Sequence, residues 1–367
     1  MALLSLGLPR LLMLSSMGFA SSCYGLSISL DYGPDQAGMS FFSSRPQAKA
    51  ALDAAAADLS ALLAPTHFTG ISPAGTPNVN LISGFNGATH VDTNWDLQYT
   101  NPATGALDTI ASPTIAADTM KVFVGMNAIG AGFLGEGAPG GAQIAVGATG
   151  SGSQVVGATA NMQNLSNTYM GRGAGPTISS FTGSLTLGGT TASFSLNLGV
   201  LLGSLSFNND TDGVNGTDSL ATLDNFWHYN HLTAVASGKS DFYSVALHEL
   251  MHTLGFGASD TWTGKASGTT WLGANGIAAN GGTGANLIDP DGAHIRSGYM
   301  STNIYTGLAQ ESPMDPSLSF GTRKMMTAID VAVLKDLGYT VAPVPEPGSA
   351  LLFSGAALGA LLARRRR

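Results

Sequence analysis

Apolar and polar positions along the chain change their spacing twice, and these changes separate helical from extended stretches. Residues 47–63 carry alanine and leucine at helical spacing, with Pro65 just beyond, which predicts a helix. Residues 78–207 instead alternate short β-like runs, for example at 120–124, 142–146 and 184–202, with turns rich in Gly, Ser, Asn and Thr. Helical spacing returns only after Asp218. A helix and strands followed by further helices indicate an α+β fold.

The segment 241–255 predicts a helix that carries metal-binding chemistry. Asp241 is a suitable N-cap, and Gly255 breaks the helix at its other end. His248 and His252 are four positions apart, so both imidazoles emerge on one face, as a tetrahedral zinc ion requires. Glu249 lies beside the first histidine, where it can accept a proton from an attacking water. The apolar residues that would bury this helix are Val245, Leu247, Leu250, Met251 and Leu254.

Two histidines leave a catalytic zinc site one protein ligand short, because such sites have three protein ligands and one water. Four downstream residues carry suitable ligand atoms: Asp260, Asp291, His294 and Glu311. Residue types and spacing alone leave all four open.

Residues 248–256 read HELMHTLGF and resemble the signature of metzincin zinc proteases, in which a glycine turns the chain after the second histidine. The third histidine of that signature normally follows six positions later, but Ala258 stands there. Leishmanolysin-like metzincins carry it further downstream, after an insertion and before a methionine-containing turn. By this resemblance, 257–291 is the insertion, His294 is the third ligand, and Met314, within 312–316, is the methionine of the Met-turn.

The resemblance covers roughly residues 218–339 and the C-terminal tail and says little about residues 26–200, but the fold of the family gives an expectation for the domain. It implies a twisted mixed sheet with a zinc-binding active-site helix, residues 26–255, and a smaller C-terminal subdomain, residues 256–343. Residues 327–339 predict a closing helix with Gly338 at its end. In metzincins a strand upstream of the zinc helix pairs with the substrate, and residues 120–126 are the candidate for that strand.

Both ends of the chain have the composition of targeting segments. Residues 1–25 combine Arg10, an apolar run and small residues after it, which predicts an export signal peptide. The single cysteine, Cys23, stands at the expected cleavage point, so the mature chain is expected to contain no disulfide.

The other end, residues 344–367, resembles the PEP-CTERM sorting signal of Gram-negative bacteria: Val344-Pro345-Glu346-Pro347, an apolar stretch and four arginines. The apolar stretch has 15 residues, about 22 Å as a helix, which is shorter than the roughly 30 Å membrane core. The resemblance implies transient anchoring in the inner membrane, processing by an exosortase-type enzyme, and a final location at the cell surface, in the extracellular matrix or in the medium.

Charge and the remaining motifs narrow the expected partners. Removing both end segments takes away five arginines and one glutamate, which changes the formal net charge from −8 to −12. An acidic chain argues against nucleic acid as a partner. An oxygen-rich cluster, Asn208, Asp210, Asp212 and Asp218, can bind calcium or form ordinary turns. The glycine-rich residues 130–135 lack the context of a dinucleotide site and are interpreted as a loop.

The other histidines lack a comparable pattern. His228 and His231 precede the zinc helix and could line its cleft or bind a second zinc, although a structural loop is favoured; His67 and His90 are interpreted as structural.

The leading hypothesis is therefore an exported zinc metalloendopeptidase acting on a protein or peptide substrate. Two alternatives stay open: a non-catalytic β-rich matrix or adhesin protein with a vestigial zinc site, and a zinc hydrolase of a non-peptide amide. The intact His248, Glu249 and His252 favour the enzyme.

Overall fold

The computed structural model describes residues 25–71, 81–111, 114–130, 132–214 and 216–343. The expected sorting tail, and the expected signal peptide apart from Gly25, lie outside these residues. Within the described ranges, no helix is both long enough and apolar enough to cross a membrane.

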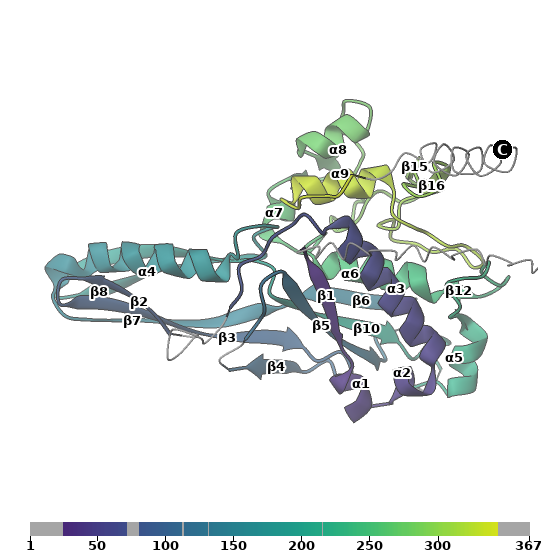
Figure 1. Cartoon of the computed structure of the whole chain (residues 1–367), viewed down its shortest axis with the longest axis horizontal. Helices are drawn as coiled ribbons and strands as arrows, with labels where there is room; N and C mark the ends of the chain where they lie inside the picture. The colour runs from purple at the N-terminus through teal and green to yellow at the C-terminus, as the bar shows by residue number, and fades with distance from the viewer. Residues whose placement is uncertain (1–24, 72–80, 112–113, 131, 215, 344–367) are drawn as a thin grey trace, which may run out of the picture.

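A four-stranded mixed sheet forms the centre of the molecule, with the strand order β1-β5-β10-β6 (Figure 1). Strands β1 (Ser27–Asp31), β5 (Thr119–Asn127) and β10 (Leu202–Asn208) are parallel, and β6 (Gly135–Pro139) is antiparallel to β10. Met120, Val122 and Val124 of β5 are fully buried, as expected of a central strand. The expected substrate strand at 120–126 is therefore wrong, because β5 is paired on both sides. The edges of this sheet are β1 and β6.

Two long helices pack against each other and against this sheet. Helix α3 (Pro46–Leu62) confirms the predicted alanine-rich helix, and its small residues allow close approach to helix α6 (Phe242–Thr253), which carries the two histidines. Short helices α1 (Gly33–Ala37) and α2 (Phe41–Ser44) precede α3. The large apolar core lies between these helices and the sheet. The buried face of α3 consists of Ala48, Ala51, Leu52, Ala55, Ala56, Leu59 and Leu62.

A long projection, here called the arm, extends away from the central sheet (Figure 1). Its elements are β2 (Leu81–Asn86), β3 (Thr89–Thr100), β7 (Gly141–Thr149), η1 (Gly152–Gln154), α4 (Val155–Met170), β8 (Ser179–Leu187) and β9 (Thr190–Leu198). Strand β3 pairs with β2 and β7, and further along with β4 (Leu107–Ile110). Just after α4, the buried Arg172 donates hydrogen bonds to four main-chain carbonyls at the base of the arm. The acceptors are Thr69, Ala116, Thr119 and Val200.

Helix α4 corrects the expectation that helical structure returns only after Asp218. Its buried stripe includes Ala158, Thr159 and Ser166, so small and polar residues occupy positions that are apolar in an ordinary amphipathic helix. The small residues are needed because α4 lies directly on strand β2. A Cβ added to Gly84 would come within 2.0 Å of the Met162 main-chain nitrogen.

The chain after α6 folds into short elements that pack beside that helix. Strands β11 (Trp227–His228) and β12 (Ser240–Asp241) and helix α5 (Leu220–Phe226) precede α6. After it come α7 (Asp260–Thr263), β13 (Ala266–Ser267), β14 (Thr270–Trp271), α8 (Ala274–Ala279), β15 (Met300–Thr302), β16 (Ala309–Glu311) and α9 (Ala328–Asp336). Helix α9 confirms the predicted closing helix, with Thr327 as its cap. The fold mixes helices and sheets, consistent with the expected α+β class.

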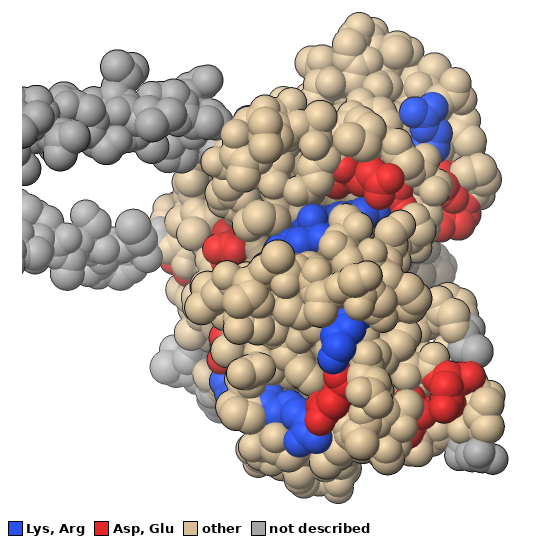
Figure 2. All heavy atoms as spheres, turned by 90° about the vertical axis from the view of Figure 1, so that its right-hand side faces the viewer, with Lys and Arg blue, Asp and Glu red and all other residues tan. Residues whose placement is uncertain are grey.

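Charged groups are sparse on the face in Figure 2, where Lys and Arg lie scattered near Asp and Glu among uncharged atoms. This agrees with a chain in which only 10% of the residues are charged.

Candidate metal centre

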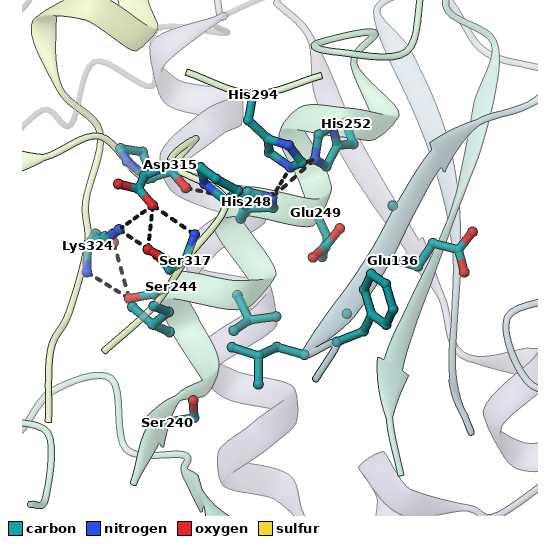
Figure 3. Close-up of a pocket in the computed structure, with 18 of the residues that line it drawn as sticks. Glu136, Ser240, Ser244, His248, Glu249, His252, His294, Asp315, Ser317 and Lys324 are labelled. Carbon is teal, nitrogen blue, oxygen red and sulfur yellow. Dashed lines mark hydrogen bonds and ion pairs between the residues drawn. The ribbon is translucent and has the colours of Figure 1, made fainter. Parts of the chain in front are cut away.

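Helix α6 holds its two histidines on one face, as the sequence predicts. Asp241 caps the helix, and its Oδ2 accepts hydrogen bonds from the Ser244 main-chain N–H at 3.1 Å and from Arg323 Nε at 2.9 Å. Gly255, at φ +91°, takes the left-handed conformation that turns the chain away after the helix. His248 and His252 therefore project together into the space beside α6 (Figure 3).

His294 comes from the loop after α8 and completes a triangle with these two histidines (Figure 3). The Nε2 atom of His294 lies 3.2 Å from that of His248 and 3.1 Å from that of His252, and the latter two atoms are 3.1 Å apart. Tetrahedral zinc with Zn–N bonds of about 2.1 Å separates its ligand nitrogens by about 3.4 Å. The spacing of the three nitrogens thus fits one small metal ion.

The opposite ring nitrogen of each histidine is held by an oxygen acceptor, which determines its tautomer. Each Nδ1 must carry its proton to donate to that oxygen, and each Nε2 then presents a lone pair to the other two. The acceptors are the Pro313 carbonyl for His248 at 2.7 Å, the Phe256 carbonyl for His252 at 2.8 Å and Asp291 Oδ2 for His294 at 2.6 Å.

Burial keeps the two helix histidines neutral. Desolvation, reinforced by the neighbouring imidazoles, lowers the pKa of His248 well below its ordinary value and that of His252 to about 4. The Nε2 atoms of these two imidazoles and of His294 converge on one point, where a cation can bind. The group can hold a metal ion.

Glu249 lies in the same cavity, beside the histidines (Figure 3). It is 6% exposed, and burial raises the pKa of its carboxyl group to about 8. Glycines of the edge strand β6 make room for it: a Cβ added to Gly135 would come within 2.8 Å of the Glu249 side chain, and one added to Gly137 within 2.1 Å of its carbonyl oxygen. The Gly-x-Gly pattern at 135–137 is the sequence signal for this contact.

The three other candidates for the third ligand have different roles. Asp291 accepts the hydrogen bond from His294, so it orients that imidazole. Glu311 forms an ion pair with Lys324 at 3.0 Å. Asp260 is exposed at the start of α7.

The predicted Met-turn lies next to the triangle. Met314 is fully buried, and its carbonyl oxygen accepts a hydrogen bond at 2.9 Å from Ile295, the neighbour of His294. The preceding Pro313 supplies the acceptor for His248. The main chain of the turn therefore supports two of the three histidines, whereas the role of the methionine side chain stays a prediction.

A cavity of about 770 Å³ opens beside the triangle. On one side it is lined by β6 and the loop before it, and on the other by residues 313–324. Sequence reasoning missed two polar residues on its wall, Ser240 and Lys324, because nothing in their local pattern marks them.

The remaining candidates lie outside this centre. Carboxylate oxygens of Asp210, Asp212 and Asp218 lie within 4.8 Å of one another, and calcium at this cluster stays a prediction. His228 Nε2 lies 2.9 Å from the Asn230 carbonyl, and the His231 ring stacks on Tyr243. Neither histidine lines the cavity, which agrees with the structural interpretation.

Comparisons with protein-family models, curated proteins and solved structures found no match to this chain. The functional argument therefore depends on the geometry: three converging imidazoles, a buried carboxyl group beside them, and a cavity bounded by a strand edge.

Proposed function

We propose that this protein is a zinc-dependent endopeptidase whose metal ligands are His248, His252 and His294. The observation that carries the proposal is the convergence of three Nε2 atoms, 3.1 to 3.2 Å apart, with Glu249 in the same cavity. Three imidazoles leave a fourth position for water, which is the composition of a catalytic zinc site. We also propose that the chain is a metzincin-like protease, on the strength of the HELMHTLGF motif and the turn at Met314.

Glu249 is the proposed general base. Bound zinc would polarise the scissile carbonyl and lower the pKa of the attacking water, and its charge would favour the ionised form of the nearby carboxyl group. Glu249 takes the proton from that water and passes it to the leaving amine. The imidazoles keep their orientation because their Nδ1 atoms stay bonded to Pro313, Phe256 and Asp291.

The edge strand β6 is the proposed docking site for the substrate main chain. It pairs with β10 on one side, and no described strand pairs with its other side. Glu136 and Gly137 of this strand line the cavity. An extended peptide can add to such an edge through main-chain hydrogen bonds, which supports a peptide over a small amide as substrate.

Export, transient anchoring in the inner membrane and processing by an exosortase-type enzyme remain part of the proposal. Their support is the sequence of residues 1–25 and 344–367. A surface or extracellular location suits a protease that acts on proteins outside the cell.

The test compares wild type with Glu249→Ala on quenched peptides, with zinc content measured for both. We expect hydrolysis to fall by about 10²- to 10⁴-fold while zinc stays bound, because the variant loses the base and keeps the ligands. Asp53→Ala, which removes a carboxylate from a surface ion pair on α3, is the control and should cleave like wild type. Zinc binding without Glu249-dependent cleavage would support the vestigial site, and cleavage of non-peptide amides alone would support the third hypothesis.

A further inference from the structure

Among the described residues, one buried polar group on the cavity wall has no hydrogen-bond partner. Ser240, in the short strand before α6, is 1% exposed and lines the cavity. Its Oγ is buried and makes no hydrogen bond within the described residues. Buried hydroxyl groups are normally hydrogen-bonded, so an unpaired one on a cavity wall indicates a place for a ligand group.

Two other serines that line the cavity differ from Ser240, because their hydroxyl groups have hydrogen-bond partners. Ser244 also lines the cavity, but its Oγ donates to Asp241 Oδ2 at 2.7 Å. Ser317, on the opposite wall, donates through its Oγ to Asp315 at 2.7 Å. Both hydroxyl groups are therefore occupied within the protein.

Ser240 lines the cavity at a distance from the histidines, in the lower part of Figure 3. It precedes His248 by eight positions, two of extended chain and six of helix, which span roughly 16 Å along the chain at the strand and helical rises. A substrate side chain that enters beside the metal centre must be long to approach Ser240.

The apolar residues of the cavity lining favour an aromatic ring without charge. Phe226, Val245, Leu318 and Phe320 line the cavity, and the rings of Phe226 and Phe320 meet edge to face at 5.8 Å. Lys324, which lines the cavity, and the adjacent Arg323 are already paired within the protein, so a negatively charged tip would be buried without compensation. Arg323 Nη2 lies 2.7 Å from Asp241 Oδ1, and Lys324 Nζ lies 3.0 Å from Glu311 and 3.5 Å from Asp315.

We propose that Ser240 is a specificity-determining residue that selects a tyrosine next to the scissile bond, by a hydrogen bond between its hydroxyl group and that of tyrosine. Tyrosine combines the required length, an aromatic body and a neutral hydrogen-bonding tip. The inference rests on the proposed peptidase function and adds the substrate class to it.

The test uses pairs of quenched peptides that differ only in having tyrosine or phenylalanine at one residue next to the cleaved bond. One pair varies the residue before the bond, and a second pair varies the residue after it. At one flank, wild type should prefer tyrosine by about 2- to 10-fold in kcat/KM, the worth of one neutral hydrogen bond. In Ser240→Ala this ratio should fall to about 1, and because it is a ratio, a general loss of activity cancels. Ser317→Ala, which removes a hydroxyl already bonded to Asp315, should keep the preference.

A binding measurement separates this inference from the peptidase proposal. The same peptides are titrated against zinc-loaded Glu249→Ala, with and without Ser240→Ala, so no cleavage is needed. A tyrosine preference that disappears with Ser240→Ala supports the inference even if no peptide is hydrolysed. Equal binding of both peptides, a preference that survives Ser240→Ala, or no binding of either peptide overturns it, while Glu249-dependent cleavage would still stand.

Discussion

Helices α6 and α4 are similar in length and have very different surroundings. Eleven of the 12 residues of α6 are buried, so protein packs around nearly its whole circumference. Only six of the 16 residues of α4 are buried, and they lie along one face, against the strands of the arm. Helix α6 also has a side-chain cap, from Asp241, whereas α4 has none. A helix enclosed on all sides can hold metal ligands in fixed positions, and a helix packed on one face can open separately from the rest.

The cores behind the two helices differ in the same way. The core around α6 reaches from α3 across the central sheet to α9. The core under α4 consists of six buried residues: Val91, Val155, Ala158, Met162, Ala192 and Leu196. The central sheet with the helices packed on it is here called the body. The comparison predicts that metal binding at the histidines depends on the packing of the body and is insensitive to substitutions that destabilise the arm.

The largest expected effect is on the metal centre itself. His294→Ala removes one of three converging imidazoles, so zinc affinity should fall by more than the 10- to 100-fold typical of lost outer-shell partners, and hydrolysis should disappear with it. Zinc affinity is measured by competition with a chelator of known affinity. His228→Ala is the matched control, because that imidazole bonds to Asn230 outside the cavity, and it should keep its zinc. Wild-type affinity in His294→Ala would place the third ligand elsewhere.

A pair of methionine truncations tests the contrast between the two cores. Met251 in α6 and Met162 in α4 are both fully buried, and truncating a buried methionine to alanine costs about 2–5 kcal/mol. Met251→Ala should lower the global free energy of unfolding, measured by denaturation. Met162→Ala should mainly accelerate amide exchange in α4, β8 and β9, while zinc binding stays at the wild-type level.

If Met162→Ala instead accelerates exchange throughout the body or loses zinc, the two regions unfold as one unit. The structural reason to examine this outcome is Arg172, which follows α4 and donates a hydrogen bond to the carbonyl of Thr119 in β5 of the central sheet.

The features that the sequence predicted are those that depend on residues close together in the chain. The two histidines on one face of α6, the cap at Asp241 and the turn at Gly255 follow from spacing within residues 241–255, and the structure contains them all. The position of His294 was expected from the resemblance to a family, since its approach to α6 depends on contacts across 42 residues.

Features that depend on distant pairing were missed. The central sheet places β10 between β5 and β6, although β10 is far from both in the sequence, so β6 is an edge strand and β5 is not. Helix α4 was missed because its buried stripe contains Thr159 and Ser166, whose polarity hides the helical period. Ser240 and Lys324 became candidates only because the fold places them on the wall of the cavity that the histidines also line.

The smallest expected effect concerns a carboxyl group buried in the body. Asp330 of α9 accepts hydrogen bonds from Ser312, in the turn that holds Met314, and from Thr327. Burial raises its pKa to about 6 despite these donors. Folding therefore favours the protonated form of Asp330. Its contribution to the stability of the fold is fully present below pH of about 4 and is lost as the pH rises through 6.

The variant Asp330→Asn carries no ionisable group at this position and so isolates the effect. From pH 4 to pH 7, wild type should lose about 2.5 kcal/mol of unfolding free energy relative to the variant, which is most of the roughly 3 kcal/mol that a shift from 3.8 to about 6 is worth. Urea denaturation of metal-free protein at each pH gives this difference without interference from zinc loss. Met162→Ala in the arm should follow the pH slope of wild type, because it leaves Asp330 and its donors in place. A pH-independent difference between wild type and Asp330→Asn would show that the folded pKa is not raised, and that the donors from Ser312 and Thr327 offset the cost of burial.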